Sequence, residues 1–227
     1  MSLPQPRTVE LDWTQQYRIV PSSFPPVDFF ESLVDPDLMQ EAYAVESLTN
    51  DRLRDQVGDI TLVVPEDRIS VSGSTPVMAA FTHIGIDSRF SDGSYGVYYA
   101  ARDMKTAVAE TAFHRAKFLR ATNEEPGDID MRVYIGQVTQ PMHDIRSGEY
   151  DDLHRADDWL PGQAFGAGMK AVNAWGLVYR SVRDKGGECI AAFRPPAVSI
   201  PVQGPHLAYV WNGKDIVDVI EKKVFRP

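Results

Sequence analysis

The sequence contains a single cysteine among its 227 residues. Cys189 has no partner for a disulfide within the chain, as is typical of proteins that fold in a reducing compartment. A run of about 18 or more apolar residues, the length that a membrane-spanning helix requires, is also missing. The first residues, MSLPQPRTVELDW, lack the apolar core of a signal peptide. We therefore expect a cytoplasmic protein that does not insert into a membrane.

Positive charge is scarce as well. Lysine and arginine together number 23 against 32 aspartates and glutamates, which gives a formal net charge of -9. Proteins that bind nucleic acid need clustered Lys and Arg to neutralise phosphates, so we expect no direct nucleic-acid partner. The content of 43% hydrophobic and 24% charged residues is that of an ordinary globular protein. The length fits one domain, or one domain with an extension.

Familiar metal and nucleotide motifs are missing too. His154, Asp157 and Asp158 lie close together, but they lack the spacing of a zinc site or a calcium loop, and we predict no metal. The glycine-rich GQAFGAGMK matches neither the dinucleotide fingerprint nor the phosphate-binding loop, and we interpret it as a helix-packing segment. Cys189 lies in ECIAAF, a predicted core strand, where cysteines are usually inert.

The first 75 residues differ from the rest in their sequence pattern. PSSFPP interrupts regular structure, and residues 35–53 carry apolar side chains at helical spacing. The run DITLVVPEDRISV that follows resembles a strand interrupted by Pro65. We predict that residues 1–75 form a helical N-terminal extension that packs on a core domain of residues 76–227.

The remaining sequence indicates an α+β fold. Residues 77–84 fit a strand or a helix, residues 131–145 alternate as a strand does, and residues 163–175 favour a helix. Two hairpins are predicted, LVYRSVRDKGGECIAAF around its Gly-Gly pair and YVWNGKDIV around an Asn-Gly turn with positive φ. Because strands and helices do not alternate strictly, we expect a mainly antiparallel sheet flanked by helices.

The stretch RFSDGSYGVYYAARDMKTAVAE, residues 89–110, carries the most distinctive chemistry. Its short strand places Tyr98 and Tyr99 on opposite faces, so that one ring reaches the core and the other a cleft. A helix is predicted to start near Asp103, with Glu110 at the border of its apolar stripe. Spacing alone also allows Glu110 to be a solvated helix glutamate and Arg89 a loop cation.

A second motif adds to this stretch. RFSDGSYGVYYAARDMKTAVAETAFHR, taken with GLVYRSVRDKGGECIAAF, resembles the RES domain, named for an arginine, a glutamate and a serine. Arg89, Tyr99 and Glu110 keep the family's intervals, and the serine falls on Ser181. The resemblance covers roughly residues 80–200, and the C-terminal YVWNG hairpin is similar to the ParT-type branch.

The resemblance implies both a fold and a reaction. RES proteins resemble ADP-ribosyltransferases, and they are typically toxins paired with an Xre-like antitoxin. NAD is then the expected substrate, and ADP-ribose is transferred to a protein acceptor. Hydrolysis or phosphorolysis of NAD by the same site is the alternative. A third possibility is a non-catalytic binding module in which the arginine, tyrosine and glutamate form a structural ion pair.

The resemblance also implies roles for the residues. Cleavage of the nicotinamide–ribose bond builds positive charge on the ribose, which Glu110 would stabilise. Arg89 would hold the pyrophosphate or the nicotinamide ribose, and Tyr99 would stack on nicotinamide. Ser181 would donate a hydrogen bond to the nicotinamide amide or to Glu110. Arg18, in QYRIV, is either a second phosphate ligand or a structural residue.

Two histidines flank this stretch of the sequence. His83 precedes it, and His114 lies one helical turn beyond Glu110, on the same side of the predicted helix. A lone histidine more often packs or forms a structural hydrogen bond than takes part in catalysis. We therefore assign neither histidine a catalytic role.

Overall fold

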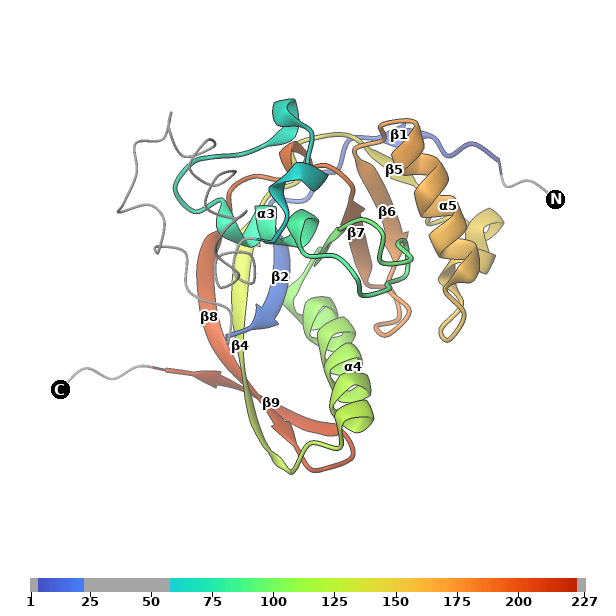
Figure 1. Cartoon of the computed structure of the whole chain (residues 1–227). Helices are drawn as coiled ribbons and strands as arrows, with labels where there is room; N and C mark the ends of the chain where they lie inside the picture. The colour runs from blue at the N-terminus through green and yellow to red at the C-terminus, as the bar shows by residue number, and fades with distance from the viewer. Residues whose placement is uncertain (1–3, 23–57, 224–227) are drawn as a thin grey trace.

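A computed structural model describes residues 4–22 and 58–223. One nine-stranded sheet runs through them in the order β1-β5-β6-β7-β3-β2-β4-β8-β9. Neighbouring strands are antiparallel except β5 and β6, which are parallel. Helices α3 (Thr75–Thr82), α4 (Met104–Thr122) and α5 (Leu160–Ala171) lie beside the sheet (Figure 1). The predicted α+β class with a mainly antiparallel sheet is confirmed.

The strands vary from two to ten residues. They are β1 (Thr8–Val9), β2 (Gln16–Pro21), β3 (Tyr98–Ala101), β4 (Gly127–Gly136), β5 (Met142–Asp144), β6 (Gly176–Arg180), β7 (Glu188–Ala192), β8 (Val202–Trp211) and β9 (Ile216–Lys222). Four short 3-10 helices complete the described elements: η1 (Ile60–Leu62), η2 (Pro65–Asp67), η3 (Gly148–His154) and η4 (Pro195–Ala197).

Strand β3 shows how the sheet separates two apolar layers. Tyr98 and Ala100 pack in a cluster that contains the buried face of α3, whereas Tyr99 and Ala101 pack in the cluster that contains α4. This alternation follows from the period of two in a strand. The predicted division of the two tyrosine rings between opposite faces is confirmed.

Helix α4 begins where the sequence predicts. Asp103 is its N-cap, and its carboxylate accepts a hydrogen bond of 2.9 Å from the Thr106 amide. Such a cap satisfies an amide that has no partner within the helix. The helix ends at Asn123, whose φ of 52° places it in the left-handed region. Figure 1 shows α4 lying beside the sheet, next to β2 and β9.

Glycines bring α5 close to the loop that contains Arg89. A Cβ on Gly162 would lie 2.4 Å from the Arg89 carbonyl oxygen, and one on Gly166 would lie 2.3 Å from that of Phe90. Real Cβ atoms do not approach oxygen so closely, so these two positions require glycine for this packing. Interpreting GQAFGAGMK as a helix-packing segment is therefore correct.

The described part of the N-terminal segment differs from the prediction. Residues 4–22 contribute β1 and β2 to the sheet, and β2 lies in its middle between β3 and β4. For these residues, a helical extension packed on the core is wrong, because β2 pairs on both edges and its residue Ile19 is buried. The predicted helix over 35–53 lies outside the described residues. The boundary at residue 75 stays a prediction.

Three local predictions also need correction. DITLVVPEDRISV forms η1 and η2 instead of a strand, since the Asp59 side chain caps η1 and Pro65 begins η2. The predicted strand over 131–145 is divided between β4 and β5, which lie far apart in the sheet. Both hairpins form, but in the second one only Gly213 has a positive φ, of 89°. The Asn212 side chain instead accepts hydrogen bonds from the amides of Lys214 and Asp215.

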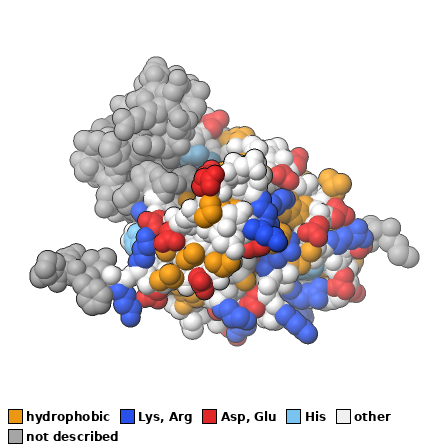
Figure 2. Space-filling view, turned by 90° about the horizontal axis from the view of Figure 1, so that it is seen from below, with side chains coloured by type: hydrophobic (Ala, Val, Ile, Leu, Met, Phe, Trp, Pro, Cys, Tyr) orange, Lys and Arg blue, Asp and Glu red, His pale blue; other side chains and the backbone are white. Residues whose placement is uncertain are grey.

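The surface carries charges of both signs. On the face shown in Figure 2, Lys and Arg side chains are interspersed with Asp and Glu side chains. Among the described residues, no helix combines the length and apolar character needed to cross a membrane.

Candidate active site

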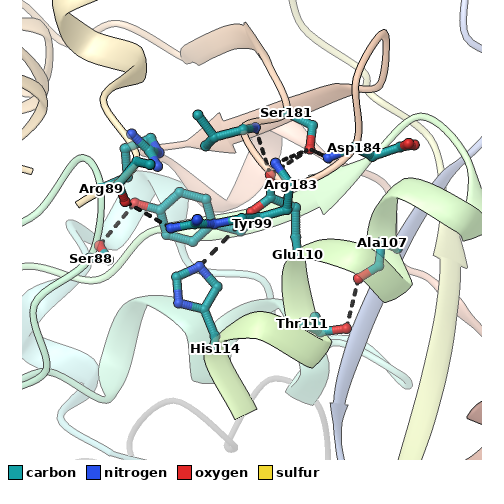
Figure 3. Close-up of polar contacts among 12 residues, drawn as sticks. Ser88, Arg89, Tyr99, Ala107, Glu110, Thr111, His114, Ser181, Arg183 and Asp184 are labelled. Atoms are coloured by element: carbon teal, nitrogen blue, oxygen red, sulfur yellow. Dashed lines mark hydrogen bonds and ion pairs between the residues drawn. The ribbon is translucent and has the colours of Figure 1, made fainter. Parts of the chain in front are cut away.

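Glu110 lies on α4 with its carboxylate turned toward the loop after β6. Only 16% of its side chain is exposed. Its Oε1 atom accepts hydrogen bonds from the Ser181 hydroxyl at 2.6 Å and from the Val182 amide at 3.1 Å (Figure 3). A carboxylate held by two donors keeps its position and has its second oxygen left for another partner. The solvated helix glutamate that spacing alone allowed is therefore excluded.

Ser181 positions this carboxylate. Its Oγ accepts hydrogen bonds from the Arg183 amide at 3.2 Å and the Asp184 amide at 2.9 Å, which directs its own proton toward Glu110. Asp184 in turn accepts a hydrogen bond of 2.8 Å from Thr106 on α4. The loop and the helix are therefore joined at Glu110 and again one turn before it, at Thr106. Of the two roles implied for Ser181, the hydrogen bond to Glu110 is present.

Tyr99 occupies the wall between two cavities. One cavity of about 510 Å³ is also lined by Arg18, and a smaller one of about 90 Å³ is lined by Arg18 and Glu110. The Tyr99 hydroxyl pairs with the Ser88 hydroxyl at 2.9 Å and accepts from the Phe90 amide at 3.0 Å. Burial raises the pKa of Tyr99 to about 12, so the phenol stays protonated at neutral pH.

Arg89 is buried, with an exposed fraction of 7%. Its Nη1 atom donates to the carbonyl oxygens of Leu153 at 3.1 Å and Arg155 at 2.8 Å. Part of the guanidinium therefore holds the η3 segment in place. A role for Arg89 in binding the pyrophosphate or the nicotinamide ribose stays a prediction.

Arg18 reaches the same place from β2. Its Nη1 donates to the Tyr99 carbonyl at 3.0 Å, and its guanidinium carbon lies 4.6 Å from the centre of the Tyr98 ring. Burial lowers the pKa of Arg18 from its ordinary value. The Nε atom is buried without a hydrogen-bond partner among the described residues. Arg18 thus makes a structural contact with β3 and also lines both cavities.

Comparisons with known proteins show the family of the chain. The family model of the RES domain matches residues 65–212. The chain belongs to the RES family. An uncharacterized protein of Sinorhizobium fredii, y4oC, is 31% identical over 201 residues, which are 88% of this chain and 84% of y4oC. Strand β2 and Arg18 lie outside the matched RES residues.

Among solved structures, a chain of the M. tuberculosis MbcT–MbcA toxin–antitoxin complex is similar to this one. The TM-score is 0.39 at 14% identity, and the match covers 61% of this RES chain and 92% of the other.

Sequence reasoning missed Arg183 in this RES domain. Its guanidinium carbon lies 3.3 Å from the centre of the Phe113 ring, and its Nη2 donates to the Ala156 carbonyl at 2.8 Å. Burial lowers the pKa of Arg183, whereas the Glu110 carboxylate raises it. The motif RSVRD places this arginine two residues after the serine, but only the fold shows that it lies beside Glu110.

His114 and His83 have different surroundings. The His114 Nε2 lies 3.9 Å from the Glu110 Oε2, which confirms that the two share one side of α4. Burial lowers the pKa of His114, which favours the neutral ring at neutral pH. His83 follows α3, with its Nδ1 3.0 Å from the Ala79 carbonyl, and lines the larger cavity.

Two remaining expectations concern metal and thiol chemistry. Among the described residues, no group of three or more His, Cys, Asp or Glu side chains is arranged to hold a metal ion. Cys189 is 2% exposed in β7, as predicted for a core strand, and burial raises the pKa of its thiol well above the ordinary value.

His154 is expected to make folding sensitive to acid. Its Nε2 accepts a hydrogen bond from the Arg180 amide at 3.2 Å, so its Nδ1 carries the proton and donates to the Tyr150 carbonyl at 2.9 Å. Burial lowers the pKa of His154 below 6.5. The unfolded chain therefore binds the proton more readily, and the free energy of unfolding is expected to fall as pH drops through about 6.5.

This expectation is tested by urea unfolding between pH 7.5 and 5. His154 contributes at most about 1.4 kcal/mol per pH unit, the slope for one proton. His154→Gln, which retains a donor and an acceptor without titrating, should have a shallower slope than the wild type. Equal slopes in the two proteins would contradict the assignment.

Proposed function

We propose that this RES protein is a toxin that cleaves the nicotinamide–ribose bond of NAD and transfers ADP-ribose to a cellular protein. The observation that carries the proposal is the Glu110 carboxylate, fixed by Ser181 and the Val182 amide at a cavity that Tyr99 and Arg18 also line. Membership of the RES family supports it, because the resemblance of these motifs implies NAD chemistry.

The reaction suits a fixed carboxylate. As the bond between the ribose C1 and the nicotinamide nitrogen breaks, its electron pair leaves with nicotinamide and positive charge develops on the ribose. Glu110 lies ready to stabilise that charge, and it needs no reorganisation because Ser181 already holds it. A nucleophilic side chain of the acceptor then bonds to C1 and loses its proton. Tyr99 would orient the nicotinamide ring by stacking.

Local charge supports an anionic substrate. Arg18 lines both cavities, Arg89 lies close enough to Tyr99 to oppose slightly the rise that burial causes in the pKa of the phenol, and Arg183 interacts electrostatically with Glu110. These three arginines lie around the Glu110 site, although the chain as a whole carries a net charge of -9. Arginines gathered at one site favour a substrate with a diphosphate, to which guanidinium groups bind well.

The proposal includes two protein partners. The first is an Xre-like antitoxin that silences the toxin in the cytoplasm, as the family resemblance implies. The second is the protein that accepts ADP-ribose.

Incubation with a cell lysate and NAD labelled in the adenine moiety tests the proposal. Mass spectrometry should find labelled ADP-ribose on a protein, and the label should be absent when Glu110→Gln replaces the wild type. Release of free ADP-ribose or its 1-phosphate without labelled protein would favour hydrolysis or phosphorolysis. Intact NAD after long incubation would overturn NAD cleavage and favour a binding module.

A further inference from the structure

We infer that Arg183 binds the diphosphate of the substrate, an inference that rests on the proposed NAD reaction. Arg183 lies in the loop that positions Glu110, and its backbone amide donates to the Ser181 hydroxyl that holds the carboxylate. Figure 3 shows Arg183 drawn together with Ser181 and Glu110. The Glu110 carboxylate also acts electrostatically on the Arg183 guanidinium, so we expect substrate bound at Glu110 to lie near this side chain.

The Arg183 guanidinium is held in place, but not all of its N–H donors have hydrogen-bond partners in the part of the chain that the structure describes. Its Nη2 donates to the Ala156 carbonyl and its flat face lies on the Phe113 ring, which fixes its orientation. Its Nε is buried and has no hydrogen-bond partner among the described residues. A buried donor without a partner destabilises the folded state, so the described part of the protein itself leaves part of this guanidinium unsatisfied. With 17% of the side chain exposed, a ligand has access to part of it.

Few carboxylates in the described part of the protein neutralise the positive charge of Arg183. Asp157 lies 3.7 Å from Nη2, but its side chain is 90% exposed, and water screens a pair of this kind. Glu110 is the other nearby carboxylate, and the proposed reaction needs its charge for the ribose. A diphosphate would supply the missing negative charge and also accept hydrogen bonds from a planar guanidinium.

The chemistry of the reaction indicates which part of the substrate Arg183 binds. Positive charge develops on the ribose, so an arginine beside Glu110 opposes bond cleavage unless an anionic group neutralises it. The diphosphate is the anionic group of NAD. Arg183 is therefore expected to contribute to the binding of NAD, and a substrate without a diphosphate gains nothing from it.

Kinetics with two substrates test the inference. Arg183→Gln should weaken NAD cleavage, measured as kcat/KM, by roughly tenfold to a hundredfold, mainly through KM. Cleavage of nicotinamide riboside, which lacks the diphosphate, should change little. Arg183→Lys retains the charge without the planar fork, so its kcat/KM for NAD should lie between those of the wild type and Arg183→Gln. The matched control is Arg180→Gln, which removes an exposed arginine of the same segment that pairs with Asp151.

The inference would be overturned if Arg183→Gln lowered kcat/KM equally for NAD and nicotinamide riboside, or if it left kcat/KM for NAD unchanged. Calorimetry with ADP gives a second readout that does not depend on NAD cleavage. Arg183→Gln should weaken ADP binding by roughly tenfold or more and leave adenosine binding unchanged. Arg180→Gln should bind both ligands with the affinity of the wild type. Thermal unfolding of each variant checks that the fold is intact.

The two proposals fail in different ways. A wild-type protein that cleaves no NAD but binds ADP through Arg183 would overturn the proposed reaction and retain the diphosphate site. A protein that cleaves NAD and binds ADP equally well without Arg183 would retain the reaction and overturn the site. A protein that neither cleaves NAD nor binds ADP would overturn both.

Discussion

Replacing Glu110 by glutamine is expected to slow NAD cleavage by roughly a hundredfold or more, the usual effect of losing one preorganised electrostatic group. Glutamine has the same shape and still accepts hydrogen bonds from Ser181 and the Val182 amide, so its neighbours need not move. The negative charge that is proposed to stabilise the ribose cation is lost. The loss should therefore fall mainly on kcat.

Release of nicotinamide from NAD is the measurement for this variant. Glu124→Gln is a matched control, because Glu124 lies in an exposed position just after α4. Thermal unfolding of both variants separates a loss of chemistry from a loss of fold. Wild-type turnover by a folded Glu110→Gln protein would contradict the assignment of Glu110 to the reaction.

Alanine at Gly166 is expected to destabilise the fold by roughly 1–3 kcal/mol, the range found when extra atoms are forced into a packed site. The new Cβ would lie 2.3 Å from the Phe90 carbonyl oxygen, so backbone must move to accommodate it. Phe90 also donates its amide to the Tyr99 hydroxyl, and a shift there should disturb the cavity wall. Gly162→Ala should behave similarly, because its Cβ meets the Arg89 carbonyl.

The same helix supplies the control for this experiment. A Cβ on Gly168 meets no atom within 4 Å, so Gly168→Ala is expected to stabilise α5 by roughly 0.5–1 kcal/mol through helix propensity alone. Urea unfolding of the three variants measures the difference. If Gly166→Ala proved as stable as Gly168→Ala, close packing of α5 on the Phe90 segment would be contradicted.

Local signals predicted local structure well. Asp103 caps α4 as its side chain chemistry requires, and the Gly186–Gly187 pair lies between β6 and β7, which pair as a hairpin. The position of β2 was not predictable in the same way, because its partners in β3 and β4 lie about eighty to a hundred and twenty residues away. DITLVVPEDRISV has the composition of a strand, yet the Asp59 cap and Pro65 give it 3-10 turns.

In the candidate site too, local features could be predicted from the sequence and contacts between distant segments could not. Spacing on a helix was sufficient to place Glu110 at the border of the apolar stripe and His114 beside it. The partnership of Glu110 with Ser181 depended on the family resemblance, since the hydrogen bond spans 71 residues. Neither source indicated that Arg89 donates to two carbonyls or that Arg183 lies on Phe113, because both contacts depend on how distant loops pack.

The position of β2 in the middle of the sheet has a consequence for biosynthesis. Arg18 is made early by the ribosome, but the strands on either side of β2 come from residues 98–101 and 127–136, and Ser181 follows later still. A nascent chain therefore holds β2 without its two partners until β3 and β4 have been made, and it completes the site only after Ser181 has followed. If the proposed function holds, the protein cannot cleave NAD before Ser181 has been made to position Glu110, and this interval would be available for the proposed antitoxin to be present.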